Sequence, residues 1–268
     1  MNQPLVSIVI PTYNRPDFLK KTLDSALSQS YVNIEIIVVD DCSELNLEAL
    51  KNQYASVKFL KNDSNRGACY SRNRGLKLAN GEYVNFLDDD DELLPEKIEL
   101  QVEKFNSSKD PNLGMITCHS LDYRSGKKKI VNNRVRGNIY EEILAEYIVA
   151  GTETMLFKAS VFDEIEGFDE GLESSQEYDL FIRACEKYHI NYVDKILTQR
   201  NRSRDQISLN FNKKVQGARV LFNKHNWRYK QQGILFWIKM RIKLRLLLLR
   251  FYIGKLFGEK IYRKLLVK

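Results

Sequence analysis

Short apolar runs and segments of helical periodicity alternate along the first 120 residues. The apolar runs are continuous, which is typical of strands buried on both faces of a sheet. Strands are predicted at residues 5–10, 34–39, 57–60, 83–87 and 115–118. Helices are predicted at residues 16–27, 68–79 and 95–105. Because strands and helices alternate with short links, this half predicts an α/β fold, with a mainly parallel sheet flanked by helices on both faces.

The pattern is weaker between residues 121 and 212. Basic residues at 127–129 and 134–136 predict an exposed loop or hairpin, residues 154–157 a strand, and residues 174–188 a helix. The chain is therefore predicted to divide into three parts. They are a nucleotide-binding half at 1–120, an acceptor and catalytic half at 121–212, and a basic helical extension at 213–268.

Charge separates the extension from the rest of the chain. The net charge of +7 combines −8 over residues 1–212 with +15 over residues 213–268, where Glu259 is the only acid. An acidic body is not expected to bind nucleic acid. Four cysteines without a CxxC pair predict a reduced, cytosolic chain. We expect neither a signal peptide nor an ordinary membrane-spanning helix, since no segment reaches about 18 uncharged apolar residues.

Acidic and amide side chains follow three of the predicted strands. Tyr13-Asn14 follows the first, Asp40-Asp41 the second, and residues 88–91, four consecutive aspartates, the fourth. Ligands of open α/β sheets bind at this edge. Asp and Asn also form ordinary turns, and that reading stays open for Asp40 and Asp41. Four neighbouring carboxylates predict an oxygen-liganded Mn²⁺ or Mg²⁺ site, and no His/Cys cluster indicates zinc.

A divalent cation suggests a phosphorylated substrate, yet neither GxGxxG nor GxxxxGK is present. Arg66 and Arg72 flank a predicted helix start beside a glycine, where an arginine could bind phosphate. Either could be a solvated surface arginine, but their place beside a glycine turn favours a ligand role.

Six motifs then occur in order. They are residues 11–15 (PTYNR), 38–43 (VVDDCS), 71–75 (SRNRG), 86–91 (FLDDDD), 167–170 (GFDE) and 176–183 (QEYDLFIR). Together they resemble the family-two glycosyltransferases, inverting enzymes with a GT-A fold and a Rossmann-like nucleotide half. The resemblance covers about residues 4–205.

The resemblance implies roles for the strand-end residues. Thr12 and Tyr13, with the flanking Pro11 and Asn14, would hold the nucleotide, and Asp41, beside Asp40, would bind a uracil ring. Arg72, with Arg66 nearby, would lie near the base or the pyrophosphate. Asp90 would be the leading metal ligand; Asp89 would contact the ribose or the metal shell, and Asp88 completes the DxD motif. Asp91 would cap the following helix.

Glu177 falls where the family places its catalytic base, which takes a proton from the acceptor hydroxyl. We expect it to share the inward face of Leu180, where burial raises its pKa. The alternative is a capping box between Ser174 and Glu177. Asp179 is the backup base and is expected to face solvent or a neighbouring loop.

Relatives often carry a histidine in the loop after the next strand, but residues 199–208 carry arginines here. Phosphate contacts are therefore assigned to Arg202 or Arg204, with surface solvation as the alternative. The three histidines are expected to be structural.

Aromatic and basic residues are mixed in the extension, as in helices that lie in a membrane interface. Lys239, Lys243 and Arg250 form one stripe, with Arg241 and Arg245 nearly opposite. We expect attachment to an anionic membrane surface; a packed helical pair or a protein partner is the alternative.

The combined expectation is a cytoplasmic glycosyltransferase, peripheral on the inner face of the cell membrane. It would move a hexose or N-acetylhexosamine from a UDP-sugar to a saccharide, carried on a lipid diphosphate, for a capsule, O-antigen or similar glycan. The alternatives are a sugar-nucleotide nucleotidyltransferase and a non-catalytic membrane-bound adaptor that binds a sugar nucleotide.

Overall fold

A computed structural model describes residues 3–124, 127–202, 211–258 and 262. It divides into two compact units. Unit 1 comprises residues 1–168 and 180–202, and unit 2 comprises residues 169–179 and 203–268. Helix α7 (Gln176–Cys185) contributes its first residues to unit 2 and the others to unit 1. The division at residue 212 stays a prediction.

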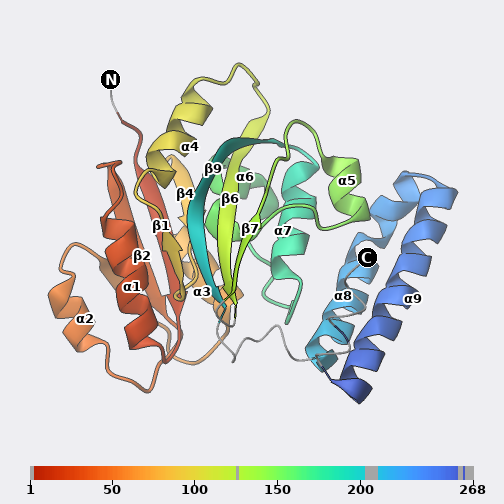
Figure 1. The fold of residues 1–268 in the computed structure, drawn as a ribbon, viewed down its shortest axis with the longest axis horizontal. Coiled ribbons are helices and arrows are strands. Elements are labelled where there is room, and N and C mark those ends of the chain that lie inside the picture. Colours follow the sequence, from red (N-terminus) through yellow and green to blue (C-terminus); the bar gives the residue numbers. More distant parts are fainter. Residues whose placement is uncertain (1–2, 125–126, 203–210, 259–261, 263–268) are drawn as a thin grey trace. The chain divides into compact units, whose positions relative to one another are not determined.

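Unit 1 is built on one mixed sheet, with nine strands in the described residues (Figure 1). The order is β3-β2-β1-β4-β8-β6-β9-β5, with β7 paired to β6. The neighbours among β3, β2, β1 and β4 pair in parallel, as do β6 and β9, whereas β5, β7 and β8 pair antiparallel. The strands are β1 (Val6–Thr12), β2 (Ile34–Asp40), β3 (Lys58–Lys61), β4 (Tyr83–Phe86), β5 (Asp91–Leu93), β6 (Leu113–Arg124), β7 (Lys127–Val131), β8 (Leu156–Lys158) and β9 (His189–Arg202).

Helices cover both faces of this sheet, as predicted. Alternate residues of β1 explain how: Ile8 packs into a core with Leu19 and Leu23 of α1 and Ile98 of α4, while Val9, on the other face, lies against α3. The helices of unit 1 are α1 (Pro16–Leu27), α2 (Glu48–Gln53), α3 (Ala68–Leu76), α4 (Lys97–Asn106), α5 (Tyr140–Ala145) and α6 (Ser160–Ile165), with a 3₁₀ turn at Thr152–Thr154.

The expected α/β architecture is confirmed, with corrections in both halves. Residues 199–202, expected in a loop, end the long strand β9. Asp91, expected to cap a helix, begins β5, and α4 starts only at Lys97. The backbone N–H of Asn201 donates to Asp91 Oδ1 at 3.2 Å, so this buried carboxyl fastens β5 to β9. The basic hairpin is present as β6 and β7.

Unit 2 contains two long helices, α8 (Phe211–Gln231) and α9 (Ile234–Phe257). Gly233 joins them at φ 103°, a backbone region that favours glycine. Their shared core is small and is centred on Ala218, Phe251 and Tyr262. In the part of the chain that the structure describes, no helix combines the length and apolar character needed to cross a bilayer.

Candidate functional site

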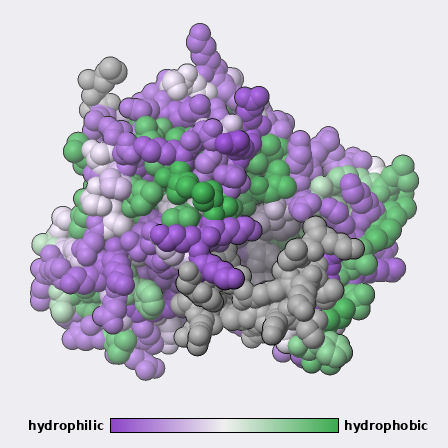
Figure 2. Space-filling model, viewed as in Figure 1, coloured by the Kyte–Doolittle hydropathy of each residue, from purple (hydrophilic) through white to green (hydrophobic). Residues whose placement is uncertain are grey.

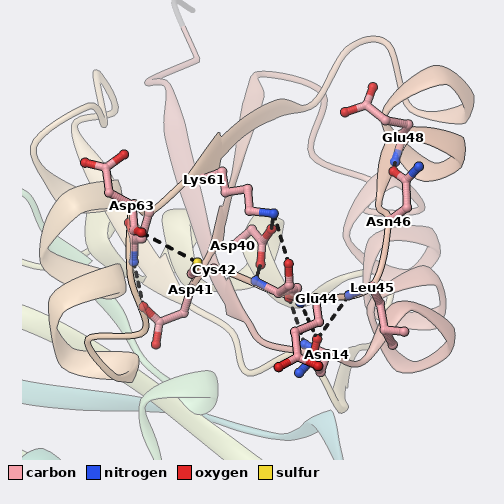
Figure 3. A network of polar contacts seen from close by, with 12 residues as sticks. Asn14, Asp40, Asp41, Cys42, Glu44, Leu45, Asn46, Glu48, Lys61 and Asp63 are labelled. Atoms are coloured by element: carbon pink, nitrogen blue, oxygen red, sulfur yellow. Dashed lines mark hydrogen bonds and ion pairs between the residues drawn. The ribbon is translucent and has the colours of Figure 1, made fainter.

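The loops after β1 and β2 are fastened together at the carboxyl edge of the sheet (Figure 3). Asn14, at φ 56°, accepts hydrogen bonds on Oδ1 from the backbone N–H groups of Glu44 (2.9 Å) and Leu45 (3.3 Å). Its own N–H donates to Ser43 Oγ at 2.8 Å. Asp40 accepts from the Ser43 N–H at 2.9 Å. Asn14 and Asp40 therefore shape the turns, which is the simpler of the two readings left open by the sequence for Asp40.

The Asp41 carboxylate is buried and receives three hydrogen bonds from the β3–α3 loop. Asn62 Nδ2 donates to Oδ1 at 2.7 Å, and the N–H groups of Arg66 and Gly67 donate at 2.9 and 2.7 Å. An ionised carboxylate has about four acceptor positions, so these contacts leave one. Asp41 thus orders the loop that leads into α3 and can still accept one hydrogen bond from a ligand.

Asp89 is held by residues of β1 and the β1–α1 loop. Thr12 Oγ1 donates to Asp89 Oδ2 at 2.7 Å, and one Arg15 nitrogen lies 3.4 Å from Asp89 Oδ1 and 3.2 Å from Asp90 Oδ2. Thr22 of α1 donates to the backbone carbonyl oxygens of Asp89 and Asp91. The predicted Thr12 and the first three aspartates are therefore neighbours, and Arg15 is a partner that we did not assign to the site from the sequence.

Asp88 is paired with Arg72, which is buried rather than on the surface. The Arg72–Asp88 separation is 2.5 Å, and the guanidinium lies 5.2 Å from the Phe168 ring centroid. Burial alone would raise the pKa of Asp88, but the Arg72 guanidinium lowers it below its usual value. Arg66 is different: its guanidinium stacks over Tyr70 at 3.7 Å.

The charged forms of the neighbouring carboxyls Asp89 and Asp90 are disfavoured. Burial raises the pKa of Asp89 to about 6, with Asp90 and Asp88 adding to the effect, and burial and Asp88 raise the pKa of Asp90. Among the described residues, no three acidic, His or Cys side chains form a complete metal site. Mg²⁺ needs only one or two carboxylates when substrate phosphates and water complete its shell. Asp89 and Asp90, which both lie near the same Arg15 nitrogen, therefore offer the ligand type that a divalent cation bound with substrate phosphates requires.

Residues 71–75 of α3, the SRNRG motif, contact Asn62, Phe168 and Val9. Asn62 donates to Ser71 Oγ at 3.0 Å, and Asn73 both donates to and accepts from the backbone of Phe168 at 2.8 Å. A Cβ on Gly75 would lie 2.4 Å from Val9 Cγ1. Ser71, Asn73 and Gly75 therefore have structural roles, whereas Arg72 contacts an aspartate of the site.

Asp91, Glu153 and Asp122 form a second acidic group, for which the sequence predicts no role in catalysis or metal binding. Burial and the Glu153 carboxylate raise the pKa of Asp91 well above its usual value. Arg200 Nε lies 3.2 Å from Glu153 Oε1 and 3.8 Å from Asp122 Oδ1. Because β5, β6 and β9 bring these residues together only in the folded chain, local sequence pattern does not indicate this group.

The predicted base lies in unit 2. The apolar face expected for its helix is buried, but the solvent-facing position expected for Asp179 is wrong. Asp179 is fully buried and contacts Lys224 and His225, whereas Glu177 is only partly buried. Helix α7 begins at Gln176, and the Ser174 hydroxyl donates to the Lys213 carbonyl oxygen at 3.0 Å. Ser174 therefore lies too far ahead of the helix to serve as its cap.

The remaining residues predicted for the site are Tyr13, Pro11, Arg202 and Arg204. Tyr13 is 41% exposed at the carboxyl edge, and Pro11 lies inside β1. The side chain of Arg202 and the whole of Arg204 lie outside the described residues. Their assignment to phosphate stays a prediction.

Residues 7–165 match the family model for glycosyl transferase family 2. An uncharacterized glycosyltransferase of Haemophilus influenzae is 32% identical over 68% of this chain and 63% of its own length. The chondroitin synthase of Escherichia coli is 30% identical over 74% of this chain and 29% of its own. A putative colanic acid biosynthesis glycosyl transferase of E. coli K12 is 31% identical over 70% of this chain and 68% of its own. The chain thus spans less than two thirds of several curated relatives.

Two solved structures have the same fold. S. aureus TarS 1–349 in complex with UDP-GlcNAc has a TM-score of 0.67 at 19% identity, covering 98% of this chain and 76% of TarS 1–349. The mannosyltransferase PcManGT of Pyrobaculum calidifontis, in complex with GDP-Man and Mn²⁺, has a TM-score of 0.64 at 17% identity, covering 99% of this chain and 79% of its own. These likenesses confirm the GT-A fold.

Proposed function

The chain belongs to glycosyl transferase family 2, and on that basis we propose that it transfers a hexose or N-acetylhexosamine from a UDP-sugar to a saccharide hydroxyl. The observation that carries the proposal is the carboxyl edge of the sheet. There Thr12, Arg15 and Arg72 hold three successive aspartates among buried polar groups. A buried group of carboxyls is costly without a cationic partner, and a metal-bound diphosphate is such a partner.

The donor nucleotide is assigned to the loops after β1 and β2. Asp41 has one acceptor position beyond its loop contacts, which suits the N–H of a uracil ring. Thr12 and Tyr13 would line the same edge. The UDP-GlcNAc complex of TarS supports a UDP-sugar, whereas the GDP-Man complex of PcManGT makes GDP the first competitor to test.

A divalent cation, Mn²⁺ or Mg²⁺, is assigned to Asp90, with Asp89 and Asp88 beside it. Such an ion would neutralise charge on the departing diphosphate. Arg15 keeps Asp89 and Asp90 paired, and Arg72 keeps Asp88 ionised. These contacts hold the carboxylates in place before substrate binds.

Glu177 is assigned as the base that removes the proton from the acceptor hydroxyl. The oxygen then attacks the anomeric carbon from the face opposite the nucleotide, so the C–O bond to the diphosphate breaks and the configuration inverts. General-base catalysis contributes about 10²–10⁴-fold. No protein nucleophile is required, which agrees with the buried cysteines Cys69, Cys118 and Cys185.

We assign the acceptor to surface-glycan synthesis, as a saccharide carried on a lipid diphosphate. The relatives named for chondroitin and colanic acid synthesis support this class of product. A lipid-linked acceptor calls for a membrane surface, and we propose that residues 213–268 bind the inner face of the cell membrane.

The exposed face of α9 supports that attachment. Five of its apolar side chains recur every three or four residues, and a sixth follows seven residues later. All six remain 42–80% exposed; they are Leu235, Ile238, Ile242, Leu246, Leu249 and Leu256. On the helix, this stripe lies between the Lys239, Lys243 and Arg250 row and the Arg241 and Arg245 pair. Figure 2 shows apolar residues along α9. An apolar stripe with basic residues on both sides fits anionic lipid, with about 1 kcal/mol per basic residue near the surface.

Vesicle flotation tests the attachment. The chain should float with phosphatidylglycerol vesicles and not with phosphatidylcholine vesicles. Replacing Leu246 and Leu249 by serine should reduce binding, whereas Val220→Ser, at an exposed apolar position of α8, should not. Equal flotation of both variants would contradict the α9 assignment.

Transfer of labelled sugar tests the catalytic assignment. Wild-type protein should transfer sugar from at least one UDP-sugar to lipid-linked acceptors, with inversion seen by NMR of the product. Glu177→Gln should lower kcat about 10³-fold, and Glu103→Gln, on an exposed turn of α4, should leave it unchanged. Wild-type binding of UDP without any transfer would favour the adaptor, and exchange of labelled pyrophosphate would favour the nucleotidyltransferase.

A further inference from the structure

We propose that α8 is a positioning element for the catalytic base, acting through His225, Lys224 and Gly217 on the turn that carries Glu177. This inference rests on the proposed function. It gives the basic extension a role in addition to the membrane attachment expected from the sequence. Residues 169–179, which include Glu177, form a compact unit with residues 203–268.

The first connection is made two residues after Glu177. The Asp179 side chain has no exposed surface, and its Oδ1 lies 2.9 Å from His225 Nε2 and 2.8 Å from Lys224 Nζ. Lys224 Nζ also lies 2.5 Å from Asp169 Oδ2. One lysine therefore ties both ends of the 169–179 segment to α8.

His225 is fixed in one tautomer by its neighbours. Arg228 NH1 lies 3.2 Å from His225 Nδ1, and a guanidinium can only donate, so Nδ1 accepts. Nε2 then carries the proton and donates to Asp179. Burial lowers the pKa of His225, in agreement with a neutral ring. A neutral donor with both nitrogens engaged holds Asp179 in one direction.

The second connection is made three residues before Glu177. Ser174 Oγ donates to the Lys213 carbonyl oxygen at 3.0 Å, and Gly217 lies directly against this serine. A Cβ on Gly217 would lie 1.9 Å from Ser174 Oγ and 3.0 Å from the Ser174 carbonyl oxygen. The turn thus meets α8 where a side chain larger than hydrogen does not fit.

These connections lie on both sides of Glu177, at residues 174 and 179. A base must lie within hydrogen-bond reach of the proton that it removes, and a displacement of about 1 Å can cost about 10²-fold in rate. Shortening or loosening α8 should therefore reduce catalysis without touching the donor site.

The main test compares three variants of the full chain. His225→Ala should lower kcat on the order of 10²-fold while the Kd for UDP stays unchanged. His225→Gln keeps a donor near the Nε2 position and should restore most of kcat. Tyr229→Ala, which removes ring contacts to Phe222 and Phe236, is the control for general damage to the helices. A His225→Ala kcat that falls only as much as that of Tyr229→Ala would overturn the proposal.

A second pair of variants uses the glycine contact. Gly217→Ala should lower kcat, and adding Ser174→Ala should recover part of the loss because the clashing hydroxyl is removed. Ser174→Ala alone should have the smaller effect. Additive losses in the double variant would contradict a direct Gly217–Ser174 contact.

Hydrogen exchange separates this inference from the proposed function. The amides of residues 176–180 should exchange at least tenfold faster in His225→Ala than in wild type, whatever reaction the protein performs. Unchanged exchange would overturn the positioning role even if transfer is confirmed. Faster exchange in a protein that transfers no sugar would retain the contact and reject the function.

Discussion

The site at the carboxyl ends of the strands in unit 1 buries charged side chains, whereas the exposed face of α9 leaves apolar side chains in solvent. At the site, charged and polar side chains such as Asp89 and Arg72 are buried, and each is held by a named partner. On α9, apolar side chains such as Leu246 and Leu249 are more than half exposed. Buried charge and exposed apolar stripes both cost free energy unless something binds them. The first region therefore suits the proposed metal-bound diphosphate, and the second suits the proposed lipid surface.

Of the substitutions at the site and on α9, replacing Arg72 should have the largest effect on the unfolding free energy. Arg72→Met leaves Asp88 beside two further carboxyls without its closest positive partner. We expect a loss of about 3 kcal/mol in unfolding free energy, toward the low end for a broken pair because Asp88 is partly exposed. Urea denaturation measures it. The double variant Arg72→Met with Asp88→Asn should recover most of the loss; no recovery would show that Arg72 acts through packing on Phe168 instead.

The buried Lys97 provides an intermediate effect with a defined pH dependence. Burial lowers its pKa to about 8 from 10.5. Between these values the unfolded state binds more protons, so stability of the wild type should rise with pH from about 8 to 10.5. Lys97→Met should lose this slope. Its unfolding free energy at pH 7 should rise by about 2 kcal/mol, because the gain from removing the buried charge exceeds the loss of the hydrogen bond to Gln101 Oε1. Lys104→Met, on the same helix, is the control. An unchanged slope in Lys97→Met would contradict the account.

The smallest effect is expected on α9. Leu246→Ser should change the unfolding free energy by less than about 0.5 kcal/mol, because Leu246 is 53% exposed. Leu23→Ser, at a fully buried position of α1, should cost about 3 kcal/mol or more. Thermal unfolding without lipid compares the two. A large loss for Leu246→Ser would mean that this face is already covered by protein.

Local pattern was enough to predict most of the elements in residues 1–120, although it missed α2 and β5. The apolar runs at 5–10 and 34–39 became β1 and β2, and the helix predicted from Pro16 to Leu27 has those bounds. Because parallel strands end at one edge, the neighbourhood of Thr12 and the aspartates followed from the element order alone.

Local pattern could not predict contacts between distant segments. Asp91 pairs with Asn201, 110 residues away, and Asp179 pairs with His225, 46 residues away. Periodicity assigns faces from apolar residues, so a buried aspartate looks solvent-exposed until its partner is known. The apolar face of α7 was predicted correctly, but the position of Asp179 and its contacts with α8 were not.

Titration calorimetry is the direct test of the proposed metal-dependent UDP site at the strand-end carboxylates. UDP should bind in the presence of Mn²⁺, more tightly than GDP or dTDP, and binding should disappear with EDTA or in Asp90→Ala while persisting in Glu177→Gln. Equal binding of all three nucleotides with and without metal, or full affinity in Asp90→Ala, would contradict the account.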